Sequence, residues 1–129
     1  MKLKLFSICL GLLMTFVANG QARLTVVNNS GRYMTVKVMQ GVGAGALHET
    51  VFISAWGSAT VYFSSSGTYF TKTKAVITQR DPVYKKGKAF RVTNDASGYS
   101  VLTLTFTIKE SAVIQSTGQS ISRAEFDRN

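Results

Sequence analysis

The residues best suited to binding a partner lie in one short stretch, RDPVYKKGKAFR, from Arg80 to Arg91. It holds five cations, two aromatic residues, one acid and the only proline of the chain. Together with the nearby Lys72 and Lys74, seven cations fall within twenty residues, against Asp81 alone. Clustered cations create a positive potential that attracts anionic partners. We therefore predict an anion-binding surface with Tyr84 as its aromatic contact, made of Lys72, Lys74, Tyr84, Lys85, Lys86, Lys88 and Arg91.

Strand alternation predicts how these cations share a surface. Successive side chains of a strand point to opposite faces, so Lys72 and Lys74 project together. If their strand pairs with Ala89–Thr93, Arg91 lies on the same solvent face and the Lys85–Lys88 loop lies above it. An anionic glycan, a lipid headgroup or another polyanion would bind there through charge, and added salt would weaken the binding. The alternative is protective, because lysines on exposed strands often prevent edge-to-edge aggregation.

Few other residues are suited to catalysis. His48 is the only histidine and Cys9 the only cysteine. We expect Cys9 to be removed with an N-terminal signal peptide, which excludes a catalytic Cys/His pair in the mature chain. A zinc site with several His or Cys ligands is excluded as well. The spacing of the six carboxylates singles out no pair for glycoside hydrolysis and no calcium loop. Gly41–Ala46 matches G-x-G-x-x-A, but the sequence leaves no room for the helix that a dinucleotide loop requires. We expect no catalytic activity, no cofactor and no metal.

The first twenty residues have the three-part order of a secretory signal peptide. Lys2 and Lys4 precede the apolar run Leu5–Val17, and small residues follow it up to Gly20. The run is shorter than the roughly 20 apolar residues of a membrane span. We predict cleavage after Gly20, export to the periplasm, cell surface or extracellular space, and no transmembrane span in the mature chain. Without Lys2 and Lys4, thirteen basic residues remain against six acidic ones, a net charge of about +7.

Residues 21–110 have the pattern of β-strands. Leu102, Leu104, Phe106 and Ile108 alternate with polar residues, as in a strand with one buried face. Clusters of Gly, Ser, Asn and Asp separate runs of this kind at short intervals. For residues 21–110 we predict an all-β fold, an antiparallel immunoglobulin-like sandwich of about seven strands. A small β-barrel is the alternative.

Residues 111–129 form a polar C-terminal tail in the sequence. We expect a frayed terminus, because chain ends without anchors are usually poorly ordered. The alternative is one helical turn at 122–127 that would dock Phe126, because Ser122 and Glu125 have the spacing of a capping box.

Two functions remain open from the sequence. The first is a small exported, non-catalytic binding protein whose basic surface recognises an anionic polymer or a component of the cell surface. The second is a structural or assembly component that engages a protein partner through an edge strand or the C-terminal tail. No motif of a folded nucleic-acid-binding domain is present in the sequence.

Overall fold

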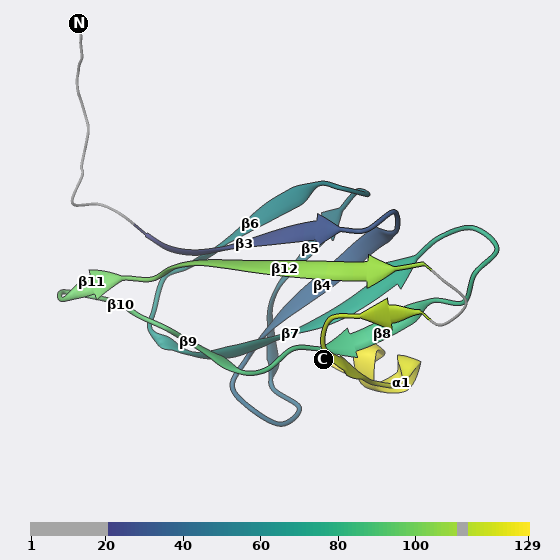
Figure 1. Cartoon of the computed structure of the whole chain (residues 1–129). Coiled ribbons are helices and arrows are strands. Elements are labelled where there is room, and N and C mark those ends of the chain that lie inside the picture. The colour runs from purple at the N-terminus through teal and green to yellow at the C-terminus, as the bar shows by residue number, and fades with distance from the viewer. Residues whose placement is uncertain (1–20, 111–113) are drawn as a thin grey trace, which may run out of the picture.

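Over the described residues, the fold consists of β-sheets and one short helix, α1 (Arg123–Asp127) (Figure 1). The computed structural model describes residues 21–110 and 114–129. The predicted signal peptide, residues 1–20, lies outside the described residues. Within them, no helix is long and apolar enough to cross a membrane. The predicted mostly-β class is confirmed.

The first large sheet has the strand order β13–β12–β3–β6. Its strands are β3 (Ala22–Asn29), β6 (Ser58–Phe63), β12 (Val101–Lys109) and β13 (Gln115–Ser116). β3 pairs antiparallel with β6 but parallel with β12, from Arg23 opposite Val101 to Asn29 opposite Thr107. The expectation of antiparallel pairing throughout is therefore wrong for this pair, because a strand pattern in the sequence does not specify the direction of its neighbour.

The second large sheet has the order β14–β8–β7–β4–β5, and β9 also pairs with β7. Its strands are β4 (Tyr33–Gln40), β5 (Ala46–Ile53), β7 (Gly67–Val76), β8 (Val83–Lys86), β9 (Phe90–Val92) and β14 (Gln119–Ser120). A separate hairpin joins β10 (Asn94–Asp95) to β11 (Gly98–Tyr99). None of the sheets in the described ranges closes into a barrel, so the alternative of a small barrel is set aside.

The apolar core lies between the two large sheets. Alternation in β3 buries Leu24 and Val26, and alternation in β4 buries Val36 and Val38. β12 adds Phe106 to the same cluster. Because each sheet directs one apolar face inward, burial of these side chains supplies the main favourable free energy of folding.

The glycine-rich stretch Gly41–Ala46 connects β4 to β5 as a hairpin. Gly41, Gly43 and Gly45 have φ angles of 101, 66 and 66°, which residues other than glycine rarely adopt. At Gly45 an added Cβ would also lie 2.8 Å from the ring of Phe70. A strand follows the stretch, so its glycines serve the turn and not a dinucleotide loop.

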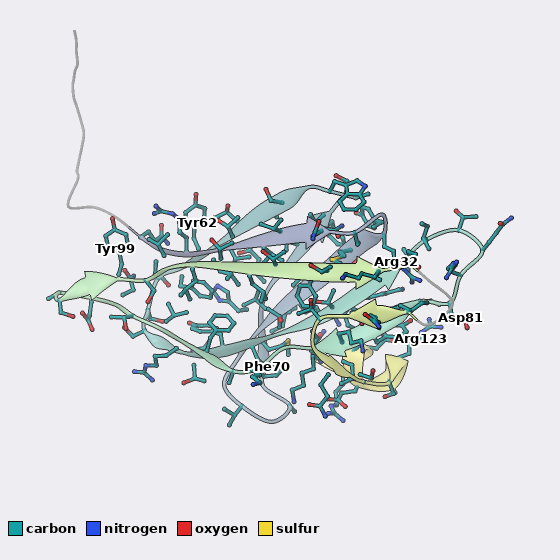
Figure 2. The ribbon with its side chains drawn as sticks, viewed as in Figure 1. Arg32, Tyr62, Phe70, Asp81, Tyr99 and Arg123 are labelled. Atoms are coloured by element: carbon teal, nitrogen blue, oxygen red, sulfur yellow. The ribbon has the colours of Figure 1, made fainter. Side chains whose placement is uncertain are left out.

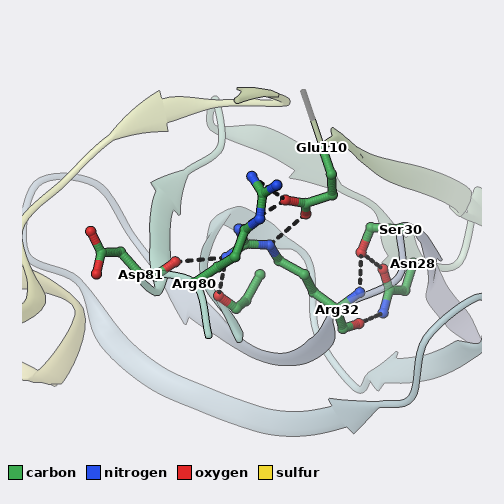
Figure 3. Close-up of polar contacts among 7 residues, drawn as sticks. Asn28, Ser30, Arg32, Arg80, Asp81 and Glu110 are labelled. Atoms are coloured by element: carbon green, nitrogen blue, oxygen red, sulfur yellow. Dashed lines mark hydrogen bonds and ion pairs between the residues drawn. The ribbon is translucent and has the colours of Figure 1, made fainter. Parts of the chain in front are cut away.

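A buried arginine joins several segments at one end of the molecule (Figure 3). Arg32, in the turn between β3 and β4, is fully buried. Its Nε and Nη2 donate to the two carboxylate oxygens of Glu110 at 2.6 and 3.1 Å. Its Nη1 donates to the carbonyl oxygens of Ala75 and Asp81 at 3.2 and 2.8 Å. One side chain thus connects the β3–β4 turn, β7, the loop after β7 and the end of β12.

The polar groups around Arg32 are hydrogen-bonded to one another. The side-chain amide nitrogen of Asn28 donates to the Arg32 backbone carbonyl oxygen at 2.7 Å, and the hydroxyl of Ser30 donates to the side-chain oxygen Oδ1 of Asn28 at 2.6 Å. The hydrogen bond from Arg32, and then the positive charges of Arg32 and Arg80, lower the pKa of Glu110 below its usual value. Figure 2 shows Arg32 and Asp81 toward the end of the molecule opposite Tyr99. This end of the two sheets is therefore fixed by charged hydrogen bonds.

We predict that Arg32→Met lowers the free energy of unfolding by about 3 kcal/mol, because it leaves Glu110 and two carbonyl oxygens without their donor. Chemical denaturation followed by tryptophan fluorescence measures this change. Arg80→Met is the matched control, since the Arg80 side chain is 46% exposed and its nitrogen lies 3.6 Å from Glu110; we expect it to cost under about 1 kcal/mol. Equal effects of the two substitutions would contradict a special role for Arg32.

Candidate functional site

The basic stretch Arg80–Arg91 forms two short strands and not one loop. Lys85 and Lys86 belong to β8, and Arg91 belongs to β9, with both strands paired to β7. Between them Gly87 donates its N–H to the Thr71 carbonyl oxygen at 2.9 Å. The expected pairing of Ala89–Thr93 with the strand that contains Lys72 and Lys74 is found, because β9 pairs with β7. The expected Lys85–Lys88 loop is wrong, because half of it is in the sheet.

Lys72 is buried, so its predicted place on a solvent face is wrong. It lies on the predicted face of β7, but α1 covers that face and leaves Lys72 only 2% exposed. Its Nζ donates to the carbonyl oxygens of Glu125, at 2.8 Å, and of Arg128. Burial, followed by repulsion from Lys37, lowers the pKa of Lys72 below its ordinary value. Alternation predicted the face, but it gave no information about what covers that face.

Lys37 is a second lysine under the C-terminus, and sequence reasoning missed it. It lies opposite Lys72 in the pairing of β4 with β7. Its Nζ donates to the Phe126 carbonyl oxygen and to the Asn129 side chain, both at 2.9 Å, and lies 4.6 Å from the centre of the Phe126 ring. Lysines suit this place because the last carbonyl groups of a helix lack partners within it. Lys37 and Lys72 together hold the C-terminal end of α1.

Tyr84 and Lys86 also contact this segment. The Tyr84 ring lies 5.7 Å from the Phe126 ring, centre to centre. Lys86 Nζ lies 3.9 Å from a Glu125 carboxylate oxygen and 4.8 Å from the centre of the Phe70 ring. Tyr84 is therefore part of a packed contact and not an open aromatic platform.

The other four predicted residues are less buried than Lys72 but do not all lie on one face of the second sheet. Lys74 is half-buried opposite Tyr84 on the outer face of the second sheet. Lys85 donates to the Ser120 hydroxyl at 2.7 Å. Lys88 and Arg91 are exposed. The structure therefore divides the predicted anion-binding surface into cations that hold the C-terminal segment and cations that face solvent.

An apolar cleft opens between the two large sheets on the side of β12. Its volume is about 430 Å³, within the range of about 300–1,000 Å³ typical of ligand sites. Leu102, Leu104 and Phe106 of β12 line one wall, and Phe90 lines the other. Leu102 and Leu104 point toward the core but remain only half-buried. Apolar side chains are thus accessible here from outside.

The outer edge of β12 is open along this cleft. Thr107 directs its backbone to that edge: its carbonyl oxygen accepts from Thr117 N–H at 3.1 Å and its N–H donates to the Thr117 hydroxyl at 3.0 Å. Because the backbone groups of a strand alternate between its two edges, Val101, Thr103 and Thr105 direct theirs to the same side. No strand in the described part of the chain pairs with β12 there before Ile108.

The C-terminal segment closes one end of the cleft. Ser116 pairs with Ile108 in the first sheet, and Gln119 pairs with Lys86 in the second, so the chain crosses between the sheets at Thr117 and Gly118. Gly118 has a φ of 94°. Residues 114–129 add β13, β14 and α1, so the expected frayed terminus is wrong for them, and α1 occupies the place of the alternative, one helical turn. The Ser122 hydroxyl caps it by accepting from Glu125 N–H at 3.1 Å.

We predict that Phe126→Ala releases the C-terminal segment and exposes Lys72. A buried phenylalanine contributes about 3–5 kcal/mol, more than a single helical turn retains by itself. Acylation of Lys72 by an amine-reactive ester, followed by mass spectrometry, measures its exposure; we expect slow labelling in the native protein and fast labelling in the variant. Asp127→Ala, at an exposed position of the same helix, should leave the labelling slow. Fast labelling of Lys72 in the native protein would contradict its burial.

The remaining candidate chemistry and the comparisons give no further site. His48 stacks on Phe63, with ring centres 5.0 Å apart, and its Nε2 lies 3.0 Å from the Tyr62 carbonyl oxygen. Across residues 21–110 and 114–129, no group of three or more His, Cys, Asp or Glu side chains is placed to hold a metal ion.

Comparison of the chain with protein-family models, curated proteins and solved structures finds no match.

Proposed function

We propose that this protein is a non-catalytic assembly component that accepts an extended segment of a protein partner at the open edge of β12. The observation that carries the proposal is the coincidence of two features: a strand edge that no other strand of residues 21–110 and 114–129 pairs with before Ile108, and an apolar cleft directly beneath it. A segment added to a sheet edge forms main-chain hydrogen bonds, and its alternate side chains enter pockets below. The β12 edge offers both kinds of contact.

The residues along the open edge support this proposal. Exposed edge strands are usually blunted by lysines, proline, bulges or short length. β12 has nine residues, without proline, and its lysine is the last of them. Val101, Thr103 and Thr105, which direct their backbone to the open edge, carry no charge. An edge of this composition is suited to pairing.

Binding of an anionic polymer through the seven predicted residues has less support. It depends on lysines that converge at the surface, whereas Lys72 is buried and Lys86 lies in contact with Glu125. Export through residues 1–20 remains part of the proposal, since an assembly component of the periplasm or cell surface would need it.

We predict that Thr103→Pro abolishes binding of a strand-forming segment. Proline removes the N–H that Thr103 directs to the open edge and leaves the pairing with β3 intact. The probe is an array of synthetic peptides of about seven residues, the length of a typical strand, in which apolar and polar residues alternate. For the peptides that bind, we expect an affinity loss of about tenfold or more, measured by fluorescence anisotropy.

The matched control is Thr103→Val, which keeps the N–H and should bind as the native protein does. The unfolding midpoint of each variant shows whether the fold is retained. If folded Thr103→Pro binds the same peptides with unchanged affinity, strand addition at β12 is contradicted. If no alternating peptide binds the native protein, the proposed function is contradicted as well.

A further inference from the structure

We infer that the segment accepted at β12 is acidic, with a carboxylate at the end that lies near Thr117. The inference rests on the proposed function and names the chemistry of the partner. It is carried by the distribution of charge around the cleft, which is independent of the open edge itself.

Lys88 stands at the rim of the cleft. It lines both the apolar cleft and an adjoining hollow of about 370 Å³, whose other walls are Lys86, Gly87, Gly118 and Gln119. The two spaces share Gly87, Lys88 and Gly118, so the hollow begins where the chain crosses between the sheets. A strand lying along β12 would end at this point. Its last side chain would meet the Lys88 ammonium group.

Lys88 is accessible and has no acidic partner among the described residues. It is exposed and lines the cleft. Arg91 is exposed too, but on β9 it alternates with Phe90 and Val92, which face the core, so its side chain points to the outer face of the second sheet. Lys88 takes part in no ion pair in the described ranges. Its ammonium group is thus available to a ligand at the rim of the cleft.

The acidic residues of the protein lie elsewhere. Glu110 binds Arg32, and Glu125 and Asp127 are on α1, near Lys86 and paired with Arg123 respectively. Among the residues that the structure describes, no carboxylate lines the cleft or the hollow. The charge of Lys88 at the rim is therefore uncompensated within the described residues, and a carboxylate of the partner would supply the missing charge.

The same charges argue against a second copy of this chain as the occupant. The chain has fifteen Lys and Arg against six Asp and Glu, so two copies repel each other. An acyl chain with an anionic headgroup would fill the cleft and meet Lys88, but it would leave the backbone groups of Val101, Thr103 and Thr105 unpaired. An extended acidic peptide is the occupant that pairs these backbone groups and neutralises the rim.

Three synthetic peptides of about seven residues test this inference. The first alternates valine and threonine and ends in two aspartates; the second has asparagine in place of aspartate; the third has the first peptide's composition with the valines grouped together. Anisotropy titrations measure the affinity of each at low salt and at about 0.5 M salt. We expect the aspartate peptide to bind about fivefold more tightly than the asparagine peptide at low salt, and the difference to vanish at high salt.

Substitution of the rim locates the effect. Lys88→Gln should remove the preference for aspartate and leave binding of the asparagine peptide unchanged. Lys74→Gln, on the outer face of the second sheet, is the matched control and should keep the preference.

The outcomes separate the two claims. Equal binding of the aspartate and asparagine peptides overturns the acidic segment and leaves strand addition standing. Equal binding of the first and third peptides means attraction by charge alone, which overturns both claims. Binding of anionic lipid vesicles but of none of the peptides would also overturn both.

Discussion

The contact between Arg32 and Glu110 is the constraint on which the arrangement of the sheets depends. It fixes the end of β12 to the β3–β4 turn and, through the carbonyl oxygens of Ala75 and Asp81, to the second sheet. A buried guanidinium is costly unless all its contacts are made, so the relative positions of these segments are narrowly set. At the opposite end of β12, Ser100 exchanges two uncharged hydrogen bonds with Thr93, just after β9. The apolar cleft opens between these two ends.

Local features of the fold were predictable from the sequence, whereas pairings between distant segments were not. Alternation identified β12 and its inward residues, and the spacing of Ser122 and Glu125 indicated a helix start that became α1. The parallel neighbour of β12 and the cover over Lys72 were not predictable, because both depend on residues dozens of positions away. For the site, the sequence located Lys88 correctly at the surface, but it could not reveal a cleft that two sheets form together.

The lysines of this protein have two physical roles. Lys37 and Lys72 direct their ammonium groups to carbonyl oxygens at the end of α1, so their charge stabilises the docked C-terminal segment. That segment also crosses between the sheets at Thr117 and Gly118 and sets the end of the cleft. Lys88 remains at the rim beside this crossing. The basic stretch thus contributes both to the fold that forms the cleft and to the charge at its rim.

Hydrogen exchange of the β12 amides tests the central claim most directly, because it reports which backbone groups are paired. In the free protein, the amides of Val101, Thr103 and Thr105 should exchange fast, and those of Leu102 and Leu104, which face β3, should exchange slowly. A bound peptide should slow the first group by at least about tenfold and leave the second unchanged. Protection of the first group without peptide, or no change when a peptide binds, would contradict strand addition at β12.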